Sequence, residues 1–249
     1  RWLTPLLAAS ALLVNLLVAA HGVANSGVRD RVRPHCTNNL KQLNLVALMY
    51  ANEHEGYYPP LSTARGRLMF ETDTVYPEYL SDPGILVCPS DTDLVEQSTA
   101  LPLEDQHQLI DDQSYFYLGY LVTSDAEMRA FAEAYQARVV AGHTFEEDLM
   151  APEGSGKAAG DRLFRLREGV ERHLIRDMAN PEEAQKLRAR IPLMWERATL
   201  APHETKTRSP HPKDKRNVIY LDGHVDLVAP GTWPYTEETM RILHDLDTP

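Results

Sequence analysis

The chain has little cysteine, and it lacks the short motifs that mark the common catalytic centres. Only Cys36 and Cys88 occur among 249 residues. Two cysteines are too few for a zinc site without histidine ligands, and their separation is not that of a zinc finger. The sequence contains no HExxH pair, no nucleophile elbow and no phosphate-binding glycine loop. We therefore expect a protein that is not an enzyme.

Positive charge is also scarce. Lysine and arginine together number 25 against 36 acidic residues, so the formal net charge is −11. The strongest basic cluster, residues 206–216, is interrupted by Asp214. Because binding to a phosphate backbone needs clustered lysine and arginine, we expect no nucleic-acid partner.

The chain does have a long uncharged run at its start. Residues 2–28 carry no formal charge when His21 is neutral, and about 20 apolar residues suffice to cross a bilayer. Such a run must be buried in a membrane or against other copies of itself. It could be a secretory signal cleaved near Gly22-Val23-Ala24, a permanent membrane anchor, or the buried spine of a filament. We expect it to be retained, with Asn15 making a hydrogen bond between helices.

The residues after this run have the pattern of an amphipathic helix. Pro34, which follows two glycines, predicts a kink or a local unwinding. Gly56, followed closely by two prolines, predicts the end of the helix. Apolar residues recur at three- and four-residue steps and predict one buried face: Cys36, Leu40, Leu43, Ala47 and Tyr50.

A second helix and several strands are expected further along. Ser124 and Glu127 form a capping box that opens a helix ending at Gly142. Its apolar stripe is expected to be core rather than a docking surface: Met128, Phe131, Ala132, Tyr135 and Val139. Asn180-Pro181 predicts the start of a short helix, and residues 162–175 are ambiguous between strand and helix.

Three strand regions are predicted from β-prone runs. Residues 113–122 are aromatic and β-prone, and residues 191–195 form an edge strand because Pro192 lies inside them. The clearest hairpin joins residues 217–221 to 224–228 through Asp222-Gly223, the strongest short-range signal of this kind.

The two cysteines and a few acidic loops are the candidate sites outside the apolar run. Cys36 and Cys88 could form one disulfide, closing a loop of about 50 residues with a stabilisation of about 4 kcal/mol. The alternative is two buried thiols. Calcium is the metal that clustered carboxylates favour, and the candidate ligands are Asp91, Asp93, Asp111 and Asp112. No EF-hand pattern occurs, so solvated loop acids remain the default interpretation of these residues.

Six blocks occur in an order that resembles one family. They resemble type IV pilin-like and type II secretion pseudopilin-like proteins, in the prepilin-type subgroup with a C-terminal His…Asp-Gly motif, here His211, Asp222 and Gly223. The blocks are CTNNLKQLNLVALMYANEHEGYYPP (36–60), YLSDPGILVCPSD (79–91), SYFYLGYLV (114–122), RLREGVERHLIRDMANP (165–181), IPLMW (191–195) and HPKDKRNVIYLDGHV (211–225).

The resemblance implies an α+β, pilin-like fold. A long N-terminal α-helix would pack on a small head made of an antiparallel β-sheet with inserted helices. Residues 1–35 would form the apolar helix that serves as filament core or membrane anchor. Residues 36–249 would form the head, which includes the C-terminal half of the long helix.

The resemblance also implies a function. The chain would be a structural subunit that polymerises with itself into an extracellular type IV pilus-like filament at the cell surface. It would pass through the inner membrane as a precursor and meet a pilus or secretion assembly machinery. The polymerisation core would comprise Leu3, Leu6, Leu7, Leu13, Val14, Asn15, Leu16, Leu17 and Val18.

Two alternatives remain open. One is a minor pseudopilin of a type II secretion system held in the inner membrane. The other, from a different class, is a membrane-tethered binding or enzyme domain.

The chain departs from the family pattern at two places. Mature pilins carry a glutamate at their fifth position, where this chain has Pro5, and begin with a methylated phenylalanine rather than Arg1. The interval from His211 to Asp222 is one residue longer than is usual for the motif. If the chain polymerises, we expect apolar packing and Asn15 to set the register that a buried charge pair sets in similar proteins.

Overall fold

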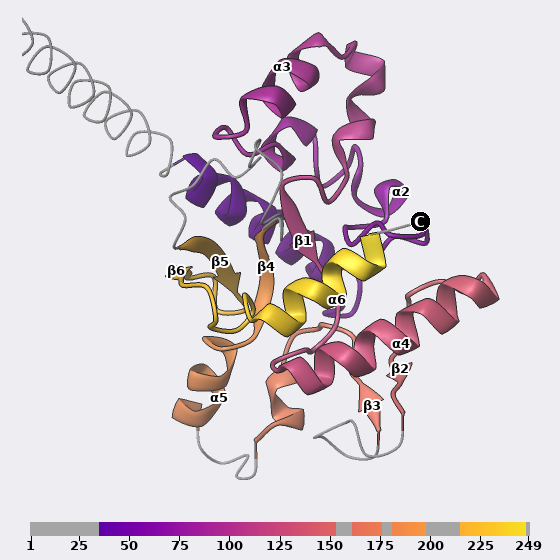
Figure 1. Ribbon diagram of the computed structural model, residues 1–249, viewed down its shortest axis with the longest axis vertical. Helices are drawn as coiled ribbons and strands as arrows, with labels where there is room; N and C mark the ends of the chain where they lie inside the picture. Colours follow the sequence, from indigo (N-terminus) through magenta and orange to yellow (C-terminus); the bar gives the residue numbers. More distant parts are fainter. Residues whose placement is uncertain (1–34, 153–160, 176–180, 198–214, 248–249) are drawn as a thin grey trace, which may run out of the picture.

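The computed structural model describes residues 35–152, 161–175, 181–197 and 215–247. The apolar run, the expected kink at Pro34, the polymerisation core and His211 lie outside the described residues. Within them, helices surround a small antiparallel sheet (Figure 1), so the chain is α+β as predicted. No helix of this part combines the length and apolarity that crossing a bilayer requires.

The described part begins with a helix over residues 35–53, which we call the N-terminal helix. It ends where the sequence predicts. Gly56 has φ +82°, and its N–H donates to the carbonyl oxygen of Ala51 at 2.9 Å. A residue without a Cβ adopts this left-handed conformation at little cost, so the helix stops there.

The main sheet has the strand order β1-β4-β5-β6, with every pair antiparallel. Its strands are β1 (Tyr115–Tyr117), β4 (Pro192–Glu196), β5 (Arg216–Tyr220) and β6 (Val225–Val228). The predicted β5–β6 hairpin is confirmed. The strand predicted over residues 113–122 is shorter than expected, because only three of its residues pair in the sheet.

The expectation that residues 191–195 form an edge strand is wrong. β4 lies between β1 and β5 in the middle of the sheet. Pro192 is the first residue of the strand, and the register shifts between Pro192 and Met194. The missing N–H of the proline therefore falls at an irregularity rather than in a regular stretch of paired strand.

Two longer helices, α4 (Asp125–Ala141) and α6 (Glu237–Asp247), pack against each other (Figure 1). Ser124 caps α4 and Gly142, at φ +69°, ends it, as the sequence predicts. Asp125 accepts hydrogen bonds from the hydroxyls of Thr236 and Thr239. The apolar stripe of α4 is core, with three of its members buried and Ala132 and Val139 partly buried.

The remaining elements are short. They are α2 (Thr72–Val75), η1 (Pro83–Leu86), α3 (Thr92–Ala100), η2 (Leu103–Leu109), β2 (Leu149–Met150), β3 (Arg162–Leu163), η3 (Val170–His173) and α5 (Pro181–Arg188). β2 and β3 form a second, two-stranded antiparallel sheet. The ambiguous region 162–175 thus contains both a strand and a helical turn, and α5 begins at Pro181 as predicted.

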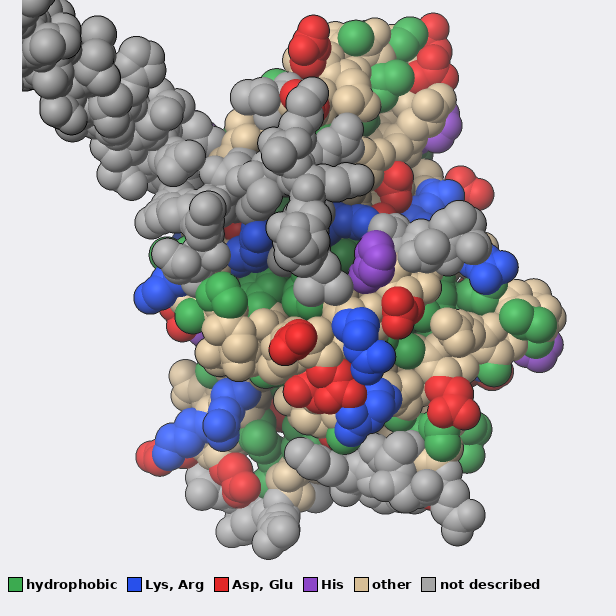
Figure 2. Space-filling model, viewed as in Figure 1, with side chains coloured by type: hydrophobic (Ala, Val, Ile, Leu, Met, Phe, Trp, Pro, Cys, Tyr) green, Lys and Arg blue, Asp and Glu red, His purple; other side chains and the backbone are tan. Residues whose placement is uncertain are grey.

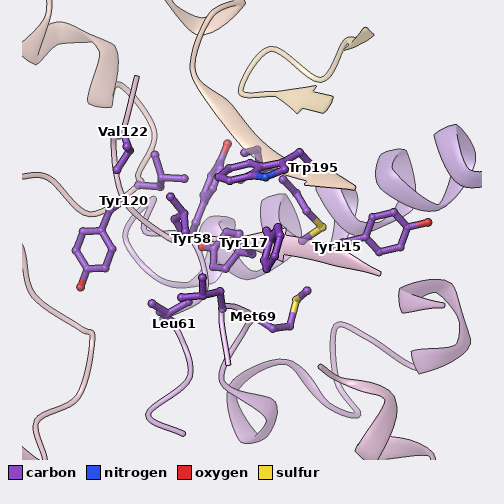
Figure 3. Packing of buried hydrophobic residues seen from close by; sticks show 14 of the residues in the cluster. Tyr58, Leu61, Met69, Tyr115, Tyr117, Tyr120, Val122 and Trp195 are labelled. Carbon is purple, nitrogen blue, oxygen red and sulfur yellow. The ribbon is translucent and has the colours of Figure 1, made fainter. Parts of the chain in front are cut away.

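The core contains large aromatic side chains from the sheet and from the segment after the N-terminal helix. Tyr58, Tyr117 and Trp195 are each at most 1% exposed and lie close together in Figure 3. The Tyr117 hydroxyl donates to the carbonyl oxygen of Pro59 at 2.7 Å. This hydrogen bond joins β1 to the segment that leaves the N-terminal helix, so the helix and the sheet share one core.

Candidate functional site

The N-terminal helix has two different faces. The five residues predicted to be buried are all buried, none of them more than 7% exposed. The opposite face carries Leu45 and Met49, which are 57% and 45% exposed and stand one turn apart. The other exposed large hydrophobic residues of the described chain, such as Leu103 and Val140, stand singly on other elements.

The inner face rests on a set of contacts that we call the seat. Thr37 donates its hydroxyl to Oδ1 of Asn217 at 3.2 Å, and the Asn39 amide donates to the carbonyl oxygen of Val87 at 3.1 Å. Asn217 belongs to β5, and Val87 follows η1. The start of the described helix is thus hydrogen-bonded both to the sheet and to the segment that precedes α3.

A buried carboxylate completes the seat. Glu196, at the end of β4, is 2% exposed. Its two oxygens accept hydrogen bonds from the backbone N–H and the side-chain amide of Asn217, at 2.9 and 2.7 Å. The Tyr235 hydroxyl donates to the Glu196 carbonyl at 2.9 Å. A buried carboxylate needs such partners, because desolvation otherwise opposes its charge.

The Asp222-Gly223 turn approaches the same helix. Gly223 has φ +84°, and a Cβ there would lie 3.4 Å from the side-chain nitrogen of Asn44. Asp222 accepts hydrogen bonds from the backbone and the ring nitrogen of His224, at 3.1 and 2.6 Å. Asp222 therefore shapes the turn, and Gly223 lets the turn come close to the helix.

The structure brings the two cysteines together at the edge of the seat. Their sulfur atoms lie 2.7 Å apart, and both residues are buried. The hydrogen bond between the two thiols and the burial of Cys88 raise the pKa of this thiol well above its usual range. Among the described residues, the one group that could supply three metal ligands is Cys36, Cys88 and Glu196. The covalent bond remains a prediction.

Three of the four expected calcium ligands share one pocket of about 560 Å³, and Asp93 does not line it. Asp91, Asp111 and Asp112 lie there beside three arginines, Arg65, Arg67 and Arg197. The positive charge of these arginines disfavours the binding of a calcium ion in the pocket. The pocket therefore gives little support to the calcium hypothesis, which remains a prediction.

Two acidic residues of this pocket have structural roles in the fold. Asp91 caps α3 by accepting from the N–H of Leu94 at 3.1 Å. Asp112 accepts from the N–H of Leu68 at 3.0 Å and pairs with Arg197 at 3.2 Å. Burial raises the pKa of Asp112 to about 7, although the Leu68 hydrogen bond and the charge of Arg197 act in the opposite direction.

Sequence reasoning did not identify Glu196 and Asn217. Each stands at the end of an apolar β-run, where a polar residue usually marks the exit to solvent. No local pattern shows that the two strand ends lie side by side under a helix more than 150 residues earlier in the chain. The one available indication in the sequence was that these residues lie in or next to segments that resemble pilin-like proteins, residues 191–195 and 211–225.

A salt-bridged face lies away from the seat. Acidic and basic side chains stand side by side over α4 and α6 (Figure 2), and Arg129 pairs with Glu238 between these helices. Exposed pairs of this kind contribute little to stability and offer no apolar surface to a partner. The outer face of the N-terminal helix is thus the better candidate for contact with another protein.

Comparison of the chain with family models, with curated proteins and with solved structures finds no match.

Proposed function

We propose that the chain is a non-enzymatic structural subunit with a pilin-like fold that polymerises with itself into an extracellular, type IV pilus-like filament. The observation that carries the proposal is the N-terminal helix, which is anchored on one face and exposes Leu45 and Met49, beside polar residues such as Lys41, on the other. In the sequence six residues, the charged segment Arg29 to Pro34, separate the uncharged run of residues 2–28 from this helix. In a filament, Leu45 and Met49 would add apolar contacts to those made by the run.

A second copy of the same chain is the partner that best fits this surface. Burying apolar area contributes roughly 25 cal/mol per Å², and a run of this length offers far more area than the head alone. If one heterologous contact repeats without closing, it produces an open helical filament. The apolar run would lie at the centre of the filament, and the acidic head would face water.

The precursor would first sit in the inner membrane through the same run. It would then pass to a pilus or secretion assembly machinery. Because the fifth position holds Pro5 rather than a carboxylate, apolar contacts must set the register, with Asn15 as the one amide among the core residues.

Electron microscopy of native surface fractions tests the proposal directly. A filament that is labelled by antibodies to the head would support it. Recovery of the chain only from detergent-solubilised inner membrane, with no filament, would contradict it and favour a minor pseudopilin or a tethered domain.

Substitutions in two regions sharpen the test. Leu13→Lys or Leu16→Lys should abolish filaments, because a charge would have to enter the apolar core. Met49→Glu should reduce filament number without unfolding the head. Leu103→Glu is the matched control, since Leu103 is 77% exposed on η2. If this variant reduces filament number as much as Met49→Glu does, the outer face of the N-terminal helix has no specific role in assembly.

A further inference from the structure

Three separate parts of the chain meet at the first turn of the described N-terminal helix. Cys36 comes from the helix, Cys88 from the loop before α3, and Glu196 from the end of β4. Their ligand atoms lie within 4.8 Å of one another, and the Ser90 hydroxyl lies 3.6 Å from the Cys36 sulfur. The two cysteines are 52 residues apart in the sequence.

The sulfur positions fit a covalent bond better than a shared metal ion. Two thiolates on one tetrahedral zinc, each about 2.3 Å from the metal, lie about 3.8 Å apart, whereas these sulfurs lie 2.7 Å apart. A disulfide needs about 2.05 Å, which a small side-chain movement supplies. Both Glu196 oxygens already accept hydrogen bonds from Asn217.

We propose that Cys36 and Cys88 form a structural disulfide that fixes the N-terminal helix to the head. The bridge joins the first turn of the described helix to the loop that leads into α3. It acts beside the Thr37–Asn217 and Asn39–Val87 hydrogen bonds, so that a covalent link and polar contacts anchor the same end of the helix.

The reaction is a thiol–disulfide exchange with a disulfide oxidant, such as oxidised glutathione. One cysteine thiolate attacks the oxidant, forming a mixed disulfide and releasing one oxidant thiolate. The second cysteine thiolate attacks the sulfur of the first and releases the other oxidant thiolate. Two electrons pass to the oxidant, and the two protons lost by the cysteines are taken up by the released thiolates.

The burial of the pair places this step during folding. Cys36 and Cys88 are 0% and 4% exposed, so an oxidant cannot reach them once the seat is complete. The raised pKa of Cys88 also keeps the thiol from ionising in the folded protein, and only the thiolate is nucleophilic. The bridge therefore forms before the helix docks fully, and is then protected from reductants.

The location gives the bridge a mechanical role, which rests on the proposed function. If the apolar run is the spine of a filament, tension on the filament reaches the head through the N-terminal helix. The disulfide carries that tension at the first turn of the described helix, so the tension is shared between the disulfide and the hydrogen bonds of the seat.

Mass spectrometry of the full chain tests the bridge itself. The detergent-solubilised chain is refolded in a mixture of oxidised and reduced glutathione, denatured, and treated with iodoacetamide. We expect no alkylation without reductant, two alkylated cysteines after reduction, and a proteolytic fragment that links residues 36 and 88. Alkylation of both cysteines without reductant, or one tightly bound zinc per chain, would overturn the proposal.

Thermal unfolding supplies a second readout. Wild-type chain that is refolded in reductant, so that the bridge never forms, should have a Tm about 10 °C below that of chain refolded with oxidised glutathione, because its unfolded state lacks the cross-link. The double variant Cys36→Ser/Cys88→Ser is the control and should not respond to reductant. Equal responses of the two proteins would contradict the bridge. A bridged chain that forms no filament would refute the proposed function alone, whereas an unbridged chain that forms filaments would refute this inference alone.

Discussion

Two buried carboxyl groups close to strand ends of the main sheet, Glu196 and Asp112, have different partners. Glu196 in the seat accepts two hydrogen bonds from one asparagine, and so joins β4 to β5 beneath the N-terminal helix. Asp112 accepts from the N–H of Leu68, pairs with Arg197 and borders a pocket. Both groups join distant segments, and the burial of Asp112 in addition raises its pKa.

The largest expected effect follows from removing the carboxylate of the seat. Glu196→Ala leaves the N–H and the amide of Asn217 buried without their acceptor, and unpaired buried groups destabilise by about 1–3 kcal/mol each. We expect a loss of about 3 kcal/mol in the free energy of unfolding, measured by urea denaturation. Glu196→Gln keeps one acceptor and should lose less. If both variants unfold alike, the hydrogen bonds to Asn217 are not what matters.

The second expected effect is a dependence of the free energy of unfolding on pH, caused by Asp112. The pKa of Asp112 is raised to about 7, above the ordinary value of about 4, so the folded state binds this proton more tightly than the unfolded state. The stability that this group contributes is complete below about pH 4 and is lost as the pH rises through about 7.

Asp112→Asn removes this titration while keeping an oxygen for the Leu68 N–H. Between pH 5 and pH 8 we expect the wild-type chain to lose on the order of 2 kcal/mol relative to the variant. Urea denaturation at several pH values measures the slopes. Asp93→Asn, at an exposed position in the first turn of α3, should retain the wild-type slope. Parallel slopes for wild type and Asp112→Asn would show that Asp112 does not titrate in this range.

The sequence predicts the local parts of this arrangement better than the contacts between them. The buried face of the N-terminal helix and its end at Gly56 follow from a 3.6-residue period and a glycine stop, which are local signals. The hairpin through Asp222-Gly223 follows from turn chemistry that two residues decide. The helix α6 was not anticipated, although Met240, Leu243 and Leu246 recur at three-residue steps and form its buried face.

The two carboxylates illustrate why the site was harder to predict. Asp112 was named only as a possible calcium ligand, whereas in the structure it accepts from the N–H of Leu68 and pairs with Arg197, two residues that are distant from it in the sequence. Glu196 was not identified, because its partner Asn217 follows it by 21 residues and both resemble solvent-facing strand ends. The position of Pro192 shows the same limit, since a strand that starts with proline can still be central when the register shifts there.

The third expected effect concerns the close approach of the hairpin to the helix. Gly223→Ala should destabilise by about 1–2 kcal/mol, because an L-residue is strained at φ +84°. Gly231→Ala is a matched control. Its φ is +80°, but no atom lies within 4 Å of an added Cβ. The difference between the two variants measures the crowding against Asn44, and equal losses would show that only the backbone conformation matters.

The smallest expected effect on stability is on the outer face of the N-terminal helix, and it separates anchoring from assembly. Leu45→Ser removes an apolar side chain that is 57% exposed, so the free energy of unfolding should change by less than about 0.5 kcal/mol. Every contact of the seat lies on the other face and stays intact.

If Leu45 meets a second copy of the chain, the same variant should nevertheless reduce filament formation. Leu103→Ser, equally mild for the fold, should leave filaments unchanged. Loss of stability with Leu45→Ser would place this residue in the fold of the head, and unchanged filaments would leave its exposure without a role in assembly.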